Sequence, residues 1–251
     1  MSSTVHREWQ AFWLALGFLT RIPMPVRIDY SPRLMNQSSV YFPLVGLLLG
    51  LLYLGLYSLL VPLWPEPVSV VLVLAFHLWI TGAFHEDGLA DSVDALGGGQ
   101  SPQARLRIMK DSRIGTYGTV ALVLALLLKA LLIPAVEPVW LAWLLPPVVA
   151  RLAPLWLMSG LTYVSDPDTS KSKPVADDFS RTRLLIATLA SLLGVAWLAG
   201  AQPALLALAA VAVTALLWGR FIRDRLGGYT GDALGAAVVL TELVLLLALA
   251  A

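Results

Sequence analysis

The sequence contains no cysteine and carries little charge for its length of 251 residues. The absence of cysteine excludes disulfide bonds, thiolate metal sites and a cysteine nucleophile. Charged residues make up 13% of the chain, whereas soluble domains carry about 25%. The net charge of +1 gives no support to a nucleic-acid partner, because such partners attract strongly basic surfaces.

Apolar residues dominate what is present. The hydrophobic fraction is 58%, the mean hydropathy is +0.78, and several apolar runs are long enough to cross a hydrocarbon core of about 30 Å. We therefore predict an all-α integral membrane protein, with residues 1–251 forming a single polytopic domain. About seven transmembrane helices are expected, at 40–63, 68–84, 116–135, 139–163, 184–200, 203–219 and 232–251.

The N-terminal segment differs from these runs. Its first residues are polar, and no cleavable signal is predicted, because the apolar piece that follows is short and lacks a small-residue cleavage site. Trp9, Phe12, Trp13 and Leu16 recur at helical spacing before the breaker Pro23. Aromatic residues favour the headgroup level of a membrane, so we predict an interfacial helix; a short helix packed inside the bundle remains the alternative.

Basic residues gather in alternate loops. These are the loop before the first span, the loop of 85–115, the loop after the fourth span and the end of the sixth span; the last two carry Lys171, Lys173, Arg181 and Arg183, and then Arg220, Arg223 and Arg225. Lys and Arg mark the cytoplasmic side. The pattern predicts a multi-pass protein of the cell inner membrane, in contact with lipid, with these loops in the cytoplasm and Ala251 outside.

The most informative stretch is residues 85–94, which reads HEDGLADSVD. In a helix, Asp87, Asp91 and Asp94 would share one face, where three carboxylates repel unless a cation lies among them. Oxygen ligands of this kind suit Mg²⁺, which usually completes its shell with water and substrate phosphates. We predict a Mg²⁺ site there; a solvated acidic helix face is the alternative.

A basic helix is predicted next along the chain. Ser101 and Pro102 form an N-cap followed by proline at the first helical position, and the cations that follow are Arg105, Arg107, Lys110 and Arg113. Cations beside metal-binding acids are what a diphosphate substrate needs. The alternative is a basic flank beside anionic lipid.

A glycine-containing turn, residues 227–232, precedes the last span. Such turns and helix N-termini bind phosphate, so Tyr229 and Thr230 are candidate substrate contacts, although Thr230 could simply cap the helix. Asp232 could act as a metal ligand or a base. Further along, Glu242 needs a partner inside the membrane; Lys129 and Arg151 are the available cations, and helix-to-helix bonding is as good an explanation as function.

The three histidines give a weaker signal. His85 and Glu86 begin like a zinc-protease helix, but the second histidine of that motif is absent because position 89 is Leu89. His85 is instead a candidate proton carrier beside the acidic site, and Glu86 a helper or base. His6 and His77 are predicted to be structural or interfacial.

Taken together, these motifs resemble the cobalamin synthase (adenosylcobinamide-GDP ribazoletransferase) family. The resemblance rests on blocks in the right order: 18–25, 41–46, 85–99, 108–118 and 228–236. It implies a Mg²⁺-dependent phosphoryl-type transfer in which a hydroxyl of α-ribazole, or of its 5′-phosphate, attacks adenosylcobinamide-GDP and releases GMP. The product would be adenosylcobalamin or its phosphate, made at a late step of vitamin B12 biosynthesis. The sequence leaves the oligomeric state open, a homo-oligomer included.

Two other classes of function fit part of the sequence: a lipid-synthesising transferase and an ion-coupled transporter. Spaced aspartates at a membrane edge also occur in CDP-alcohol phosphotransferases and in intramembrane prenyltransferases. An ion-coupled transporter is an alternative of a different class, but it should carry its functional charges near the bilayer midplane. Most charges here lie in the loops, which favours the transferase.

Overall fold

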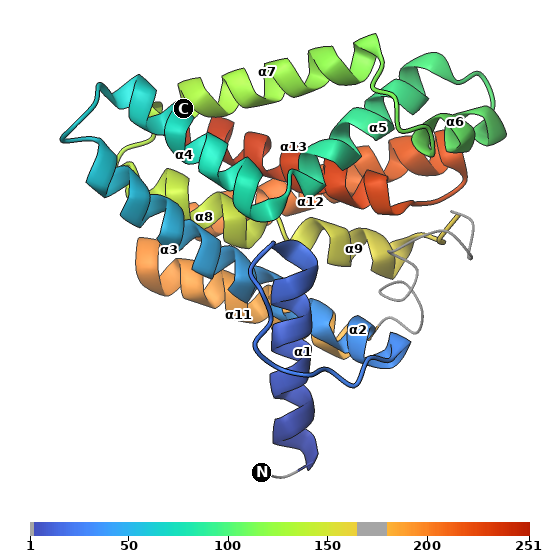
Figure 1. Ribbon diagram of the computed structural model, residues 1–251, viewed down its shortest axis with the longest axis horizontal. Coiled ribbons are helices and arrows are strands. Elements are labelled where there is room, and N and C mark those ends of the chain that lie inside the picture. Colours follow the sequence, from blue (N-terminus) through green and yellow to red (C-terminus); the bar gives the residue numbers. More distant parts are fainter. Residues whose placement is uncertain (1–2, 165–179) are drawn as a thin grey trace.

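The computed structural model describes residues 3–164 and 180–251, and these ranges form helices without a β-sheet (Figure 1). An isolated bridge joins Tyr163 to Tyr229. The helices are α1 Ser3–Leu19, α2 Pro32–Ser38, η1 Ser39–Tyr41, α3 Phe42–Leu60, α4 Glu66–Thr81, α5 Phe84–Gly98, α6 Pro102–Met109, α7 Thr116–Leu132, η2 Ile133–Ala135, α8 Trp140–Val149, α9 Leu152–Gly160, α11 Arg181–Ala199, α12 Ala201–Leu226 and α13 Gly231–Ala250.

Six of the described helical segments are long and apolar enough to cross a membrane. A seventh is counted only if the bent pair of α4 and α5 forms one span. The prediction of an all-α protein with about seven spans is therefore confirmed, with one change. The predicted span 68–84 is not a complete crossing by itself, because α4 ends at Thr81 after 16 residues. The six segments are Pro32–Leu60, Thr116–Ala135, Trp140–Gly160, Arg181–Ala199, Ala201–Leu226 and Gly231–Ala250.

The bend between α4 and α5 arises at two residues in the left-handed region. Gly82 has φ 68° and Ala83 has φ 55°, a conformation that glycine adopts freely and that costs energy for alanine. The helices meet at 88°. The Arg21 backbone amide donates to the Ile80 carbonyl over 2.7 Å, which ties the segment after α1 to the corner.

The interior of the bundle is built around α8, α9 and α13. The Trp140–Gly160 segment is the most buried of the candidate spans, and Gly231–Ala250 is next. The outer helices instead expose large apolar side chains, such as Trp197 at 88%. An apolar exterior of this extent would be unstable in water, and lipid is the surrounding that satisfies it. The protein is thus a multi-pass membrane protein.

Helix α1 is arranged differently. It crosses the direction of the spanning helices, with its N-terminal end pointing away from the bundle (Figure 1). It is absent from the candidate spans, and Trp9 on it is 46% exposed. Near its start, Glu8 accepts hydrogen bonds from Arg183 and from the Tyr41 hydroxyl. This arrangement agrees with an interfacial helix.

One end of the bundle collects the polar segments. The C-terminal end of α5, α6 and the turn between α12 and α13 lie together there, at the right of Figure 1. Both predicted caps at this end are confirmed: Ser101 Oγ accepts from the Ala104 amide, and Thr230 Oγ1 accepts from the Ala233 amide. Of the predicted basic loops, Lys171 and Lys173 lie outside the described residues.

Candidate active site

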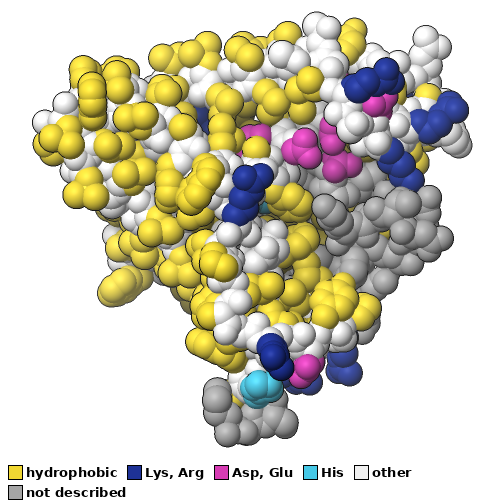
Figure 2. Space-filling view, viewed as in Figure 1, with side chains coloured by type: hydrophobic (Ala, Val, Ile, Leu, Met, Phe, Trp, Pro, Cys, Tyr) yellow, Lys and Arg dark blue, Asp and Glu magenta, His cyan; other side chains and the backbone are white. Residues whose placement is uncertain are grey.

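Three carboxylates form an open acidic surface on α5 and on the first turn of α13. Asp87 is exposed, and Asp91 and Asp232 are half-buried. The charges of Asp87, Asp232 and Asp94 all act on Asp91. Asp87, Asp91 and Asp232 form no ion pair with another described residue. Figure 2 shows the acidic side chains of this region in magenta, with Lys and Arg side chains nearby. A cluster of like charges without protein counter-ions is stabilised by binding a cation.

The two helices that carry this surface touch through their backbones. A Cβ added at Gly88 would lie 2.7 Å from the Asp232 carbonyl oxygen and 3.2 Å from the Gly235 Cα. The α5–α13 contact is also the most extensive between any two helices of the described chain. The glycine therefore sets how closely Asp232 approaches the aspartates of α5.

Asp94 has a different environment from the other predicted metal ligands. It is buried, and its two oxygens accept from the backbone amides of Gly115 at 2.7 Å and Gly118 at 2.8 Å. These amides begin α7, where the first N–H groups of a helix lack partners of their own. Asp94 thus acts as a cap for α7.

No three His, Asp or Glu side chains in residues 3–164 and 180–251 converge closely enough to form a ready-made metal centre. This does not speak against Mg²⁺, which proteins usually bind through one or two carboxylates together with substrate phosphates. Asp87 and Asp91 fit that description because both are accessible and neither is paired. Asp94 fits it less well, since both of its oxygens already accept hydrogen bonds.

The predicted cations do not form a uniform clamp. Arg105 is buried, and its Nη1 donates to the Arg225 carbonyl at 2.9 Å. Arg107, Lys110 and Arg113 are exposed. Hydrogen bonds from Arg113 hold the pKa of Asp111 down at about 2, and the pair closes at 2.6 Å. Arg107, Lys110 and Arg113 are thus the cations of this segment that solvent reaches, and Arg113 is held by Asp111.

The turn before α13 is a buried structural junction. The Tyr229 amide donates to the Thr162 carbonyl at 2.9 Å, and the Val164 amide donates to the Tyr229 carbonyl at 3.0 Å. Tyr229 is 2% exposed and its ring packs on Tyr163. Thr230 is equally buried and caps α13. Thr230 therefore caps the helix, which was the structural alternative to a substrate contact.

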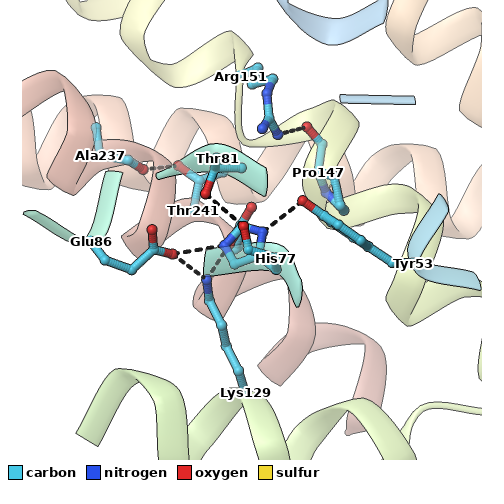
Figure 3. Close-up of polar contacts among 10 residues, drawn as sticks. Tyr53, His77, Thr81, Glu86, Lys129, Pro147, Arg151, Ala237 and Thr241 are labelled. Atoms are coloured by element: carbon cyan, nitrogen blue, oxygen red, sulfur yellow. Dashed lines mark hydrogen bonds and ion pairs between the residues drawn. The ribbon is translucent and has the colours of Figure 1, made fainter. Parts of the chain in front are cut away.

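Glu86 lies inside the bundle, in a chain of buried polar groups (Figure 3). Its Oε1 lies 2.9 Å from His77 Nε2 and 3.3 Å from Lys129 Nζ. Lys129 also pairs with Glu242 at 2.6 Å, and the Tyr53 hydroxyl lies 2.7 Å from His77 Nδ1. Lys129 is thereby the partner that Glu242 was expected to need, and the structural role predicted for His77 matches its placement.

His85 lies on the same helix but in different surroundings. It is buried, and it lines a small cavity together with Arg151 and Gly231. His6 is on α1, far along the chain from these residues, and is exposed. The structure therefore separates His85 and Glu86 from the open aspartates, although Glu86 and Asp87 are neighbours in sequence.

The helical bundle has an apolar exterior, and at one end an unpaired acidic surface lies beside cations. These features define a polytopic membrane protein with a polar site. The family model described as cobalamin-5-phosphate synthase matches residues 11–250. The chain belongs to this family, and the resemblance predicted from the sequence blocks is confirmed.

Curated relatives agree with this assignment. A Vibrio cholerae protein named adenosylcobinamide-GDP ribazoletransferase is 43% identical over 100% of this chain and 97% of its own length. A protein of the same name from Vibrio parahaemolyticus is 40% identical over 99% of this chain and 95% of its own length, and one from Shewanella halifaxensis is 42% identical over 95% and 93%. No solved structure matches the chain significantly. The prediction of a transferase is confirmed by these names.

Proposed function

We propose that this protein is a Mg²⁺-dependent adenosylcobinamide-GDP ribazoletransferase. It would join adenosylcobinamide-GDP to α-ribazole, or to its 5′-phosphate, and release GMP. Family membership supports the reaction, and the observation that carries the site is the unpaired acidic surface of Asp87, Asp91 and Asp232. A diphosphate substrate brings negative charge to this surface, so a divalent cation held by these carboxylates would complete the site.

The residues of the site would bind the metal and the diphosphate separately. Asp87 and Asp91 would hold Mg²⁺, which, when bound, neutralises the diphosphate oxygens. Arg107, Lys110 and Arg113 would contact the diphosphate from solution, while buried Arg105 positions α6 against the end of α12. Phosphoryl transfer depends on such positioning and charge neutralisation more than on a covalent nucleophile.

The bond changes need one proton acceptor. A hydroxyl oxygen of the acceptor forms a bond to the phosphorus on the cobinamide side, and the bond from that phosphorus to the GMP oxygen breaks. Asp232 is the base that we propose for the hydroxyl proton, because it is half-buried and close enough to α5 for the charge of Asp87 to act on it. Glu86, predicted as a helper or base, is engaged with His77 and Lys129 and is better placed to position α5.

We further propose that the site faces the cytoplasm from the inner membrane. The basic loops support this orientation, and with seven spans Ala251 lies outside the cell. A reporter that is active only outside the cytoplasm, fused after Ala251, should be active. An active cytoplasmic reporter at the same point would reverse the orientation.

The enzymatic test is a GMP-release assay. Protein purified in detergent should release GMP from adenosylcobinamide-GDP only when α-ribazole or its 5′-phosphate is present. EDTA should stop release, and added Mg²⁺ should restore it. Folded protein that releases no GMP with either acceptor under any divalent metal would overturn the proposal, and release that persists in EDTA would overturn its metal part.

A further inference from the structure

A groove between α9 and α12 joins an apolar wall to a cationic rim. Its volume is about 350 Å³, and Trp156, Leu157 and Leu216 line it together with Arg220 and Arg223. One water needs roughly 10–15 Å³ on this measure. The groove is therefore much larger than a water molecule or a single ion requires, and it has room for part of an organic molecule.

Two glycines and one ordered aromatic ring shape this groove. A Cβ added at Gly219 would lie 2.8 Å from Leu157 Cδ2, whereas one added at Gly160 would meet nothing within 4 Å. Gly219 thus lets α12 approach α9 at the floor, and Gly160 leaves open space at the end of α9. The Trp156 Nε1 donates to Thr188 Oγ1 at 3.1 Å, which fixes the ring that forms one wall.

The α12 side of the groove changes from apolar to cationic along one helix face. Leu216, Arg220 and Arg223 lie at i, i+4 and i+7, and therefore on the same face. Leu216 is 70% exposed, and the side chains of Arg220 and Arg223 are 76% and 56% exposed. A molecule with an apolar chain and an anionic head group has the same order of properties.

Both arginines are open to a ligand. Their contacts with Asp224 join the Arg220 Nε to Oδ2 at 3.8 Å and the Arg223 Nε to Oδ1 at 4.0 Å, which is longer than a hydrogen bond. No other ion pair forms between these arginines and the rest of the described chain. Two guanidinium groups face one carboxylate, so a net positive charge remains, and their terminal N–H groups can bind a phosphate in bidentate fashion.

The position of the groove in the bundle identifies the kind of anion. The C-terminal end of α9 points to the same end of the bundle as the C-terminal end of α5, where the polar segments lie (Figure 1). Leu216 precedes this end and faces the lipid-covered exterior. Phospholipids place their phosphates at such a boundary between apolar and polar surface, and arginines there attract anionic lipid.

The groove is separate from the acidic surface. Trp218 lies on the opposite face of α12 from Leu216, and its Nε1 donates to the Ala233 carbonyl at the start of α13 over 2.9 Å. The helix α12 thus lies between the groove and the carboxylate of Asp232. A ligand in the groove would contact α9 and α12 without touching the aspartates.

We propose that the groove between α9 and α12 binds one anionic phospholipid. Its phosphate lies against Arg220 and Arg223, and an acyl chain lies along Leu216 and Trp156. The lipid would fasten the end of α9 to α12. This site goes beyond the proposed function, because it involves neither the substrates nor the metal.

The test titrates detergent-purified protein with phosphatidylglycerol and, separately, with phosphatidylcholine of the same acyl chains, and measures bound lipid by native mass spectrometry. Phosphatidylglycerol should bind with a Kd about 5- to 30-fold lower, as expected for one or two arginines near an anionic head group. Changing both Arg220→Gln and Arg223→Gln should remove this preference. The control pair Arg27→Gln and Arg33→Gln, which changes two exposed arginines elsewhere, should retain it.

A second pair of variants tests the shape of the groove while every charge is retained. Gly160→Leu should fill the open space and weaken binding of both lipids. Gly55→Leu is the matched control, because a Cβ at Gly55 of α3 also meets nothing within 4 Å, and it should bind both lipids normally. Thermal unfolding of all variants checks that they are folded.

The contrary outcomes are distinct. Equal affinity of the unaltered protein for the two lipids would overturn the proposal without any variant. Equal losses in the two arginine pairs would show a diffuse charge effect, and unchanged binding in Gly160→Leu would place the lipid elsewhere; either result overturns the site. A dimer that Gly160→Leu converts to a monomer, with lipid binding unchanged, would make the groove a contact between copies of the chain instead.

Discussion

The backbone amide of Gly118 donates to Asp94 Oδ1 over 2.8 Å, and this bond joins the start of α7 to the helix that carries the acidic surface. The glycine is required by the closeness of the contact. A Cβ at this position would lie 2.4 Å from Asp94 Oδ2 and 2.8 Å from the Ala90 carbonyl. The acidic helix is thus fixed on this side by a backbone contact.

Gly118→Ala should therefore destabilise the protein by about 1–3 kcal/mol, the usual cost of overpacking. Gly194→Ala is the matched control, because its added Cβ meets nothing within 4 Å and alanine favours the helix. Thermal unfolding in detergent measures both. Equal unfolding temperatures for the two variants would show that the close contact of α7 with α5 at Gly118 contributes little to stability.

Lys129→Met should strongly destabilise the fold, by about 3–5 kcal/mol. Lys129 is 3% exposed and is shared between Glu86 and Glu242, so its loss leaves two buried carboxylates without their cation. Adding Glu242→Gln to Lys129→Met should recover part of the loss, as removing one charge relieves the repulsion. A single variant that unfolds like the unaltered protein would contradict this interpretation of the buried chain.

Asp91→Asn should lower kcat at least about 100-fold and leave the thermal unfolding temperature nearly unchanged. Changing a group that only supports a metal ligand already costs about 10- to 100-fold, and loss of a ligand should cost more. The substitution preserves shape and removes a half-exposed charge. Asp224→Asn makes the same chemical change at an exposed position of α12 and should be silent. Near-normal GMP release by the Asp91 variant would refute its role as a metal ligand.

Arg113→Ala should raise the KM for adenosylcobinamide-GDP about 10-fold, as expected for a lost phosphate contact. The pKa of Asp111 is lowered to about 2 by its hydrogen bonds from Arg113, so this pair stays charged from pH 5 to pH 9. The KM ratio between variant and unaltered protein should then be constant across this range. An unchanged KM would leave Arg113 as a basic flank beside lipid.

Much of the fold was predictable because the signals are local. Ser101 and Thr230 each cap a helix within three residues along the chain, and the helix of residues 85–94 follows from its own periodicity. The corner at Gly82 was missed, since apolar composition continues through residues 68–84 and only the backbone conformation ends α4 early.

The site was predicted in part. The residue types at Asp87, Asp91 and Asp232 show that they carry charge, but the separate position of Glu86 depends on Lys129, which is 43 residues away. Likewise, Asp94 shares a helix face with the other aspartates by spacing, while its use as a cap depends on where α7 begins. Such partners are set by tertiary packing, which helical periodicity does not contain.

The contact at Gly88 has a mechanical consequence. Because α5 and α13 meet backbone to backbone there, the separation of the two helix axes is set by main-chain contact and not by the packing of flexible side chains. The crossing therefore holds the two helices that carry the candidate site at a fixed separation. A larger residue at position 88 would push α5 and α13 apart. It should therefore change the spacing of the carboxylates on the two helices while every charged residue is retained.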